Sequence, residues 1–165
     1  MNWYVLYTLS YKTEEITRYL NKTKDIEAFI PRYEFYYRKD KNYQIKPMFP
    51  GYIFVKTKWN QSEINSLLSK IRVEKNGMVK QLLNEEVSAL RKEEIDMFEK
   101  LLDGNHIAGM SKAYIVDGRA VVYEGPLHYF EDHINKVDKH NQLAYLNLSF
   151  MERRIRAGLI ITEKI

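Results

Sequence analysis

The sequence predicts an α+β protein, in which an N-terminal α/β sandwich is joined by a linker to a small C-terminal β-barrel. In the first hundred residues, strand-like runs alternate with apolar residues at helical spacing. After residue 112, short strand-like runs follow one another without a helical pattern. Residues 103–112 lie between these regions and contain glycine without periodicity. We therefore predict domains at 1–102 and 113–165, with a linker at 103–112.

The N-terminal part of the chain predicts a strand, a helix and a hairpin. Residues 3–9 are apolar and β-prone, which favours a strand. Ser10 or Thr13 is expected to cap the helix that follows. A short strand at 28–30 ends at a proline, and aromatic runs within 33–45 flank a charged segment. This last pattern predicts a β-hairpin with a basic tip.

The remainder of the first domain predicts a central strand and two further helices. Residues 51–57 are β-branched and aromatic, which is typical of a buried central strand. Asn60 with Glu63 three residues later predicts a capping box at the second helix. Apolar residues at helical spacing predict a buried stripe on each of the first two helices: Ile16, Tyr19 and Leu20 on the first, and Ile64, Leu67, Leu68 and Ile71 on the second. A strand at 78–82 follows, and Asn84 is expected to cap the third helix.

The C-terminal domain predicts strands only. An Asp-Gly turn at 117–118 precedes the first clear run, at 120–123. Further strands are expected at 129–137, 143–150 and 157–162, and the segment at 143–150 alternates apolar and polar residues. Several short strands in about fifty residues favour a small barrel.

Composition excludes several classes of protein. The hydrophobic fraction of 45% is that of a globular chain, and the lack of cysteine excludes disulfides and cysteine-ligated metal sites. No apolar run is long enough for a membrane span, and no signal-peptide pattern opens the chain. We therefore predict a cytoplasmic protein. The net charge of +4 arises before residue 113, which indicates either contact with a polyanion or a solvated basic face.

Catalytic and cofactor signatures are missing from the sequence. No glycine-rich phosphate loop occurs, and no nucleophile–base pair can be argued. His128 and Glu131 are clustered, but on the predicted strand they would point to opposite faces, so we expect no metal site. The prediction is a protein that is not an enzyme and has no cofactor.

Aromatic residues surround the Pro-Gly dipeptide at 50–51. Phe49, Tyr52 and Phe54 lie within six residues, and Tyr52 and Phe54 share one strand face. Filling a core is the simpler interpretation, and an interface for a protein partner is the alternative. If these side chains anchor a partner, at least two of the three should be partly exposed in the isolated domain.

Two basic clusters are candidates for nucleic-acid binding. The first cluster combines residues of the predicted first helix with residues of the hairpin tip: Lys12, Arg18, Lys22, Lys24, Arg38, Lys39 and Lys41. The second cluster consists of Arg153, Arg154 and Arg156. Arginine suits phosphates and base edges, and nearby tyrosines can stack on unpaired bases. A hydrated surface is the alternative for each cluster.

Three motifs resemble the N-terminal domain of the NusG family of transcription elongation factors. They are Trp-Tyr-Val-Leu at 3–6, Ile-Pro at 30–31 and Phe-Pro-Gly-Tyr-Ile-Phe-Val at 49–55. The C-terminal region is similar to the KOW domain of that family, through Gly118, Val-Val at 121–122, Gly-Pro-Leu at 125–127 and Val-Asp at 137–138. The Gly-Pro-Leu form resembles specialised paralogues of the LoaP and RfaH kind. Tyr129 and Met151 stand where the pattern usually has glycine.

The resemblance implies a processive antiterminator that docks on the clamp helices of RNA polymerase. The matching pocket residues are Tyr7, Phe49, Tyr52 and Phe54. The resemblance also implies loading at chosen operons, by a nascent RNA hairpin or by non-template DNA, and a KOW domain that recruits a ribosomal protein or another factor. Two alternatives stay open: an RNA-binding KOW module tied to the ribosome, and a general NusG that recruits Rho.

Overall fold

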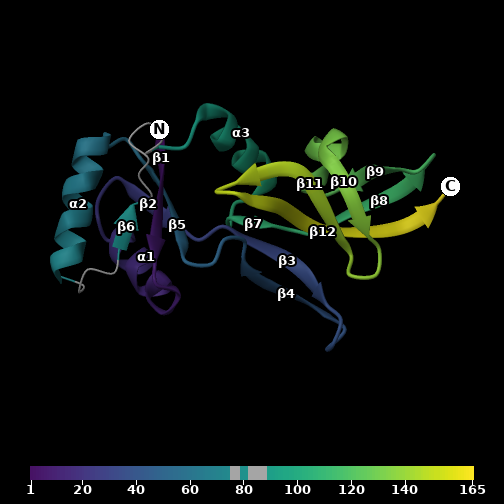
Figure 1. Ribbon diagram of the computed structural model, residues 1–165, viewed down its shortest axis with the longest axis horizontal. Coiled ribbons are helices and arrows are strands. Elements are labelled where there is room, and N and C mark those ends of the chain that lie inside the picture. Colours follow the sequence, from purple (N-terminus) through teal and green to yellow (C-terminus); the bar gives the residue numbers. More distant parts are fainter. Residues whose placement is uncertain (75–78, 82–88) are drawn as a thin grey trace. The chain divides into compact units, whose positions relative to one another are not determined.

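The computed structural model describes residues 1–74, 79–81 and 89–165 (Figure 1). The chain forms two compact units, one of Met1–Pro31 with Met48–Met97 and one of Arg32–Pro47 with Phe98–Ile165. The first unit is α/β and the second consists mainly of strands, so the predicted α+β class is confirmed. In the described part of the chain, no helix is long and apolar enough to cross a membrane.

The first unit is built on a four-stranded antiparallel sheet in the order β2-β5-β1-β6. These strands are β2 (Ile26–Phe29), β5 (Tyr52–Thr57), β1 (Asn2–Thr8) and β6 (Val79–Gln81). The predicted central strand is thus confirmed, because β5 is hydrogen-bonded on both sides. Its β-branched and aromatic residues suit a position with neighbours on both edges and both faces.

Two helices cover one face of this sheet (Figure 1). A 3₁₀ turn, η1 (Ser10–Lys12), leads into α1 (Thr13–Asn21), and α2 (Gln61–Glu74) follows β5. The predicted apolar stripes are confirmed, and they meet the sheet in one core that contains Tyr4, Leu6, Ile16, Leu20, Ile26, Ala28, Ile30, Ile53, Val55, Ile64, Leu68 and Ile71.

The two predicted helix caps had different outcomes. At α2, the Glu63 N–H donates to Asn60 Oδ1 at 2.9 Å and the Asn60 N–H donates to Glu63 Oε1 at 3.1 Å, which confirms the capping box. At α1, the N-cap is Lys12 and makes no side-chain cap bond, so the predicted cap is wrong. The Thr13 hydroxyl lies 2.7 Å from the Thr8 hydroxyl instead, which ties α1 to β1.

The third helix, α3 (Lys92–Leu101), begins later than expected. Asn84, its predicted cap, lies outside the described residues. Leu90 lies before the helix, in the segment that continues the pairing with β1, and its N–H donates to Trp3 O at 2.8 Å. Glu94 then accepts the Arg91 N–H at 2.9 Å and satisfies a free donor at the helix start.

The second unit contains a three-stranded sheet, β4-β3-β7, and a five-stranded sheet, β10-β11-β12-β8-β9. The predicted hairpin is confirmed as β3 (Arg32–Tyr37) and β4 (Asn42–Pro47), and β3 pairs in parallel with β7 (Ile107–Ala108). The larger sheet consists of β8 (Ser111–Val116), β9 (Arg119–Glu124), β10 (Ile134–Asp138), β11 (Leu143–Phe150) and β12 (Arg153–Lys164).

The predicted strand at 129–137 is wrong in its first half. Residues Pro126–His133 form two short 3₁₀ turns that meet at a kink at Phe130, together labelled η2, and only Ile134–Asp138 is a strand. Leu127 and Phe130 are buried and lie three residues apart, which is one turn of a 3₁₀ helix. Burial of this pair, with proline at the start of the segment, favours the helical turn over an extended chain.

The hairpin is attached to the rest of the second unit by polar contacts. Glu34 Oε1 accepts the Met110 N–H at 2.9 Å, and the Tyr43 hydroxyl donates to Gln142 Oε1 at 2.7 Å. Gly158 of β12 packs so closely that an added Cβ would lie 3.0 Å from Glu34 O. Residues 103–112 contain β7 and the first residues of β8, and their role as a linker stays a prediction.

Candidate functional site

The Pro-Gly dipeptide forms a tight turn at the start of β5. The Tyr52 N–H donates to Phe49 O at 3.1 Å, and Gly51 has a φ of 90°. Proline second and glycine third are the residues that a type II turn requires. Gly51 O accepts from the Thr8 N–H at 2.8 Å, and a Cβ on Gly51 would come within 2.9 Å of Thr8 O. The turn therefore holds the start of β5 against the end of β1.

Two tyrosines lie side by side where the turn joins these strands. Tyr7 and Tyr52 are opposite one another in the register, and their ring centroids are 5.3 Å apart. Tyr7 is 39% exposed and Tyr52 is half-buried. The pair presents two aromatic rings with hydroxyl groups, which is a combination typical of interface anchors.

Phe49 and Phe54 are buried behind this pair, at 1% and 0% exposure. Their rings stack at 6.3 Å, and Phe49 also lies 6.4 Å from Tyr52. In the full chain, Tyr52 is thus partly exposed, whereas Phe49 and Phe54 are buried, and the expectation for the isolated domain stays a prediction. Phe54 lies between Val5 and Phe29 on the neighbouring strands, so only the end of the aromatic row reaches solvent.

The aromatic row continues along the face of the sheet opposite the helices. Trp3 lies 5.7 Å from Phe29 and 6.4 Å from Phe54, both nearly edge to face. Lys56 Nζ lies 4.6 Å from the centroid of Trp3 and 5.3 Å from that of Phe29, within the range of a cation–π contact. Sequence reasoning missed Trp3, Phe29 and Lys56 as one group, because only strand register brings them together.

The first basic cluster is divided between the two units. Lys12 precedes α1, and Arg18 and Lys22 are exposed on α1 and at its end, in the first unit. The basic residues of 38–41 are exposed at the tip of the β3–β4 hairpin, in the second unit. These basic residues therefore form two groups, one in each unit.

The hairpin tip lies next to the turn between β10 and β11. The rings of Tyr36 and Tyr43 are 5.3 Å apart on one face of the hairpin, and Tyr43 bonds to Gln142 in that turn. Lys139 and His140 are exposed in the same turn. The contact joins the basic tip to the further cationic side chain of Lys139.

The second basic cluster is exposed along β12. Arg153, Arg154 and Arg156 all face solvent. Arg156 pairs with Tyr145 across β11, and Tyr145 pairs with Lys136 of β10. Lys136 Nζ lies 5.6 Å from the Tyr145 centroid. Lys136, Tyr145 and Arg156 form a row across three strands, here called the cationic row, which sequence reasoning missed because register is set by tertiary pairing.

The histidine–carboxylate cluster has a different geometry from the one expected. His128 and Glu131 lie on the 3₁₀ segment, and His128 Nδ1 is 3.6 Å from Glu131 Oε1, so our statement that they point to opposite faces is wrong. Glu131 accepts the Val122 N–H at 3.0 Å, and His128 Nδ1 lies 3.2 Å from Val122 O. Both side chains therefore contact the backbone of Val122 at the edge of β9. Within the described ranges, no group of three or more candidate ligands gathers around a metal position.

Two side chains have shifted proton affinities. Hydrogen bonds from the Asn141 side chain and backbone lower the pKa of Asp138. Burial raises the pKa of Tyr4, whose hydroxyl donates to Trp59 O at 2.8 Å. Both groups stabilise local structure, Asp138 in the β10–β11 turn and Tyr4 beneath α2.

Comparison with known proteins found a family match for the N-terminal part of the chain. The family model described as transcription termination factor NusG matches residues 1–99, which include the Pro-Gly turn, Tyr7, Tyr52 and the aromatic row. No curated protein matches the chain significantly. Because the family match spans more than half of the sequence and contains these features, the chain belongs to the NusG family, whose members are transcription elongation and termination factors that bind RNA polymerase and are not enzymes.

Proposed function

We propose that this protein is a specialised NusG paralogue, of the LoaP or RfaH kind, that suppresses pausing and termination at chosen operons. The observation that carries the proposal is the Tyr7–Tyr52 pair, which is partly exposed at the end of an aromatic row and fixed by the turn at Gly51. We assign the pair to the contact with the clamp helices of RNA polymerase. Phe49 and Phe54 support the pair from behind.

The mechanism follows from preferential binding. A protein that binds the closed polymerase clamp better than the open clamp shifts the population toward the closed form. Since the open form is the paused one, its population falls and elongation continues through pause and termination signals. The rigid backing of Tyr52 by Phe49 contributes because a pre-ordered anchor loses less conformational freedom on binding.

Recruitment is proposed to depend on a hairpin in the nascent leader RNA, with non-template DNA as the alternative signal. Two surfaces of the second unit support an RNA contact: the hairpin tip, whose Lys41 is two residues from Tyr43, and the cationic row of Lys136, Tyr145 and Arg156. Folded RNA is held mainly through phosphate and 2′-hydroxyl contacts, with aromatic and arginine side chains at unpaired bases.

The C-terminal barrel is proposed to be a KOW domain, with boundaries at 113–165 after a linker at 103–112. Through it the protein would recruit a ribosomal protein or another factor. The order of small strands β8 to β12 supports this assignment. A general NusG that recruits Rho would give the opposite result in the assay below, because it would promote termination.

Transcription in vitro through a strong terminator tests the proposal. We expect the wild-type protein to increase the fraction of read-through transcripts, and the Tyr7→Ala/Tyr52→Ala variant to lose this effect and to bind polymerase at least tenfold more weakly. Tyr129→Ala is the matched control, since Tyr129 is 63% exposed and lies outside the proposed surface. Unchanged or increased termination with the wild-type protein would contradict antitermination.

A binding titration tests recruitment separately. The probe is an RNA hairpin selected on the full chain from a library with a random loop, beside its DNA equivalent and a scrambled RNA. We expect the hairpin to bind best, with affinity that falls steeply with salt because phosphates release counterions. Neutralising Arg18, Lys39 or Lys41 should weaken binding without unfolding. Equal affinity for the three probes would leave only unspecific attraction, and preference for single-stranded DNA would favour the RfaH-like mode.

A further inference from the structure

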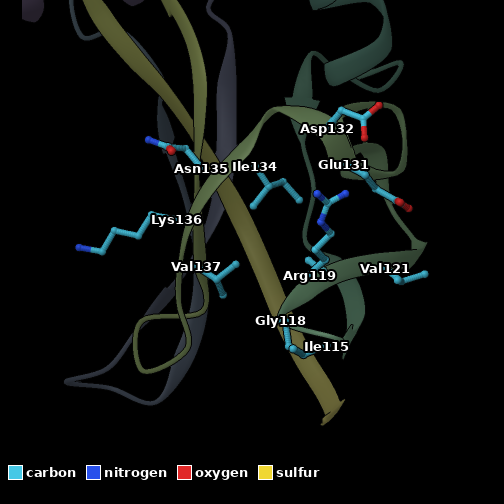
Figure 2. A pocket seen from close by; sticks show the side chains of 11 residues that line it. Ile115, Gly118, Arg119, Val121, Glu131, Asp132, Ile134, Asn135, Lys136 and Val137 are labelled. Atoms are coloured by element: carbon cyan, nitrogen blue, oxygen red, sulfur yellow. The ribbon is translucent and has the colours of Figure 1, made fainter. Parts of the chain in front are cut away.

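The second unit contains a pocket between the two edge strands of its five-stranded sheet. β9 and β10 are the outer strands of that sheet, and residues of both line the pocket, together with the turn at Gly118 and the end of η2 (Figure 2). Its volume is about 610 Å³, within the range of small-molecule sites. The family match at residues 1–99 does not extend to it.

Arg119, an exposed residue of β9, lines this pocket. Figure 2 shows the Arg119 side chain running beside Ile134 toward Glu131 and Asp132. In the described part of the chain, no carboxylate lies within salt-bridge distance of its guanidinium, and Glu131 is already engaged by the Val122 N–H. A planar guanidinium in this position can stack on an aromatic ring or bind an acceptor through its fork.

The other walls of the pocket suit a flat, partly polar ring. Ile115, Ile134 and Val137 provide aliphatic surface. Asp132 lies at the same end as Glu131 and contributes a carboxylate to the lining (Figure 2). Aliphatic walls, a stacking cation and a carboxylate acceptor together match a nucleobase that donates hydrogen bonds from one edge.

The pocket is less suited to an added peptide strand. Such a strand needs unpaired backbone groups along an edge. On β9, the Val122 N–H donates to Glu131 and the Val122 carbonyl faces His128 Nδ1. On β10, the register is broken between Ile134 and Lys136. Both edges therefore carry features that protect against strand addition.

A cationic path continues from the pocket across β10. Lys136 is one of the residues that line the pocket, and in Figure 2 its side chain extends away from Arg119. On that side it lies over Tyr145, which is next to Arg156 in the register. Phosphates that flank a base in the pocket can thus follow the cationic row, which is the arrangement typical of single-stranded nucleic-acid sites.

We propose that this pocket takes one unpaired guanine of the recruiting RNA, with Arg119 against the face of the base and Asp132 accepting from its edge. Guanine presents two adjacent N–H donors on one edge, which match the two oxygens of a carboxylate. The inference rests on the proposed function, because it specifies how the structured RNA is bound. The flanking phosphates lie along Lys136 and Arg156.

The test is an NMR titration of the ¹⁵N-labelled full chain with the four ribonucleoside 5′-monophosphates. We expect GMP to shift amides within 118–121 and 131–137 and to bind more tightly than AMP, CMP or UMP. Arg119→Ala should weaken GMP binding at least tenfold, and Asp132→Asn should reduce the preference for GMP over AMP. Lys164→Ala removes the same charge from an exposed position in the same unit and should bind GMP normally.

The outcomes separate this inference from the proposed function. Shifts confined to other residues, or unchanged GMP affinity in a folded Arg119→Ala variant, would overturn the pocket assignment even if the full chain binds an RNA hairpin. Equal affinity for the four monophosphates would overturn the guanine assignment. GMP binding in the pocket without binding of any RNA hairpin would support the pocket and contradict RNA recruitment.

Discussion

Tyr52 and Phe54 are two residues apart on one face of β5, yet they have different roles. Phe54 is buried between aromatic and aliphatic neighbours on β1 and β2, whereas Tyr52 lies at the end of the row beside the exposed Tyr7. The roles follow from how far each residue lies from the turn at the start of β5. Tyr52 pairs with Tyr7 next to this turn, and the side of the pair beyond the last strand residues faces solvent. Residue type alone does not separate them.

Alanine substitution should separate the two roles by their effect on stability. Phe54→Ala leaves a cavity in a packed face and should lower the free energy of unfolding by about 3–5 kcal/mol. Tyr52→Ala should lower it by about 1 kcal/mol, because the side chain is only half-buried. Urea denaturation of both variants measures the difference. Similar losses would show that Tyr52 belongs to the core.

Asp138 predicts a pH dependence in the turn between β10 and β11. Asn141 lowers its pKa below the usual 3.8, so the folded state releases this proton more readily than the unfolded state. The stabilisation is therefore complete above the usual pKa and is lost as pH falls through the lowered pKa. Thermal melts between pH 5 and pH 2 should show a smaller decrease for Asp138→Asn than for the wild type. An identical decrease would contradict the assignment.

At the scale of elements, two similar turns are made from different residues. Asp117 and Gly118 join β8 to β9 with φ angles of 50° and 76°. Met151 and Glu152 join β11 to β12 with φ angles of 52° and 60°. Two consecutive residues with positive φ are typical of a type I′ hairpin turn, for which Asn-Gly or Asp-Gly is preferred. Met151 thus adopts a backbone conformation that favours glycine.

Exchanging these turn residues should change stability in opposite directions. Met151→Asn with Glu152→Gly should raise the free energy of unfolding by about 1 kcal/mol, because neither new residue is strained at positive φ. The reverse exchange, Asp117→Met with Gly118→Glu, should lower it by a similar amount and is the matched control. Equal stability of both variants with the wild type would show that these turns tolerate any residue.

At the scale of the molecule, the hairpin joins segments that are distant in sequence. It lies within the first predicted domain, 1–102, but its contacts group it with Phe98–Ile165. Pairing of β3 with β7, the Glu34–Met110 bond and the Tyr43–Gln142 bond hold it there. A chain cut between the two predicted domains therefore keeps noncovalent contacts across the cut.

Brief proteolysis tests both the predicted boundary and this attachment. Asp103, Gly104 and Asn105 are exposed, so cleavage is expected there. We expect the two fragments to elute together in size-exclusion chromatography. In Gly158→Val they should separate, because the new side chain meets the Glu34 backbone oxygen. Resistance at 103–105 would contradict the linker, and separate elution of wild-type fragments would contradict the attachment.

The sequence alone determined the features that depend on neighbours along the chain. The central strand at 52–57, the apolar stripe of α2 and the Asn60–Glu63 capping box follow from local spacing, and each was predicted and confirmed. The family motifs are also local, and the match at 1–99 contains three of them. Local propensity predicts a strand at 129–133, but these residues belong to η2. The 3₁₀ conformation is favoured over a strand because it buries Leu127 and Phe130.

The tertiary structure decided which side chains share a surface. Lys136, Tyr145 and Arg156 come from three strands, and only antiparallel register aligns them. The residues of the first basic cluster belong to two units, because the contacts of the hairpin group it with Phe98–Ile165. Register and packing depend on side chains far apart in the chain, so no local pattern specifies them. The same dependence exposes Tyr7 and buries Phe54, although both belong to one aromatic face.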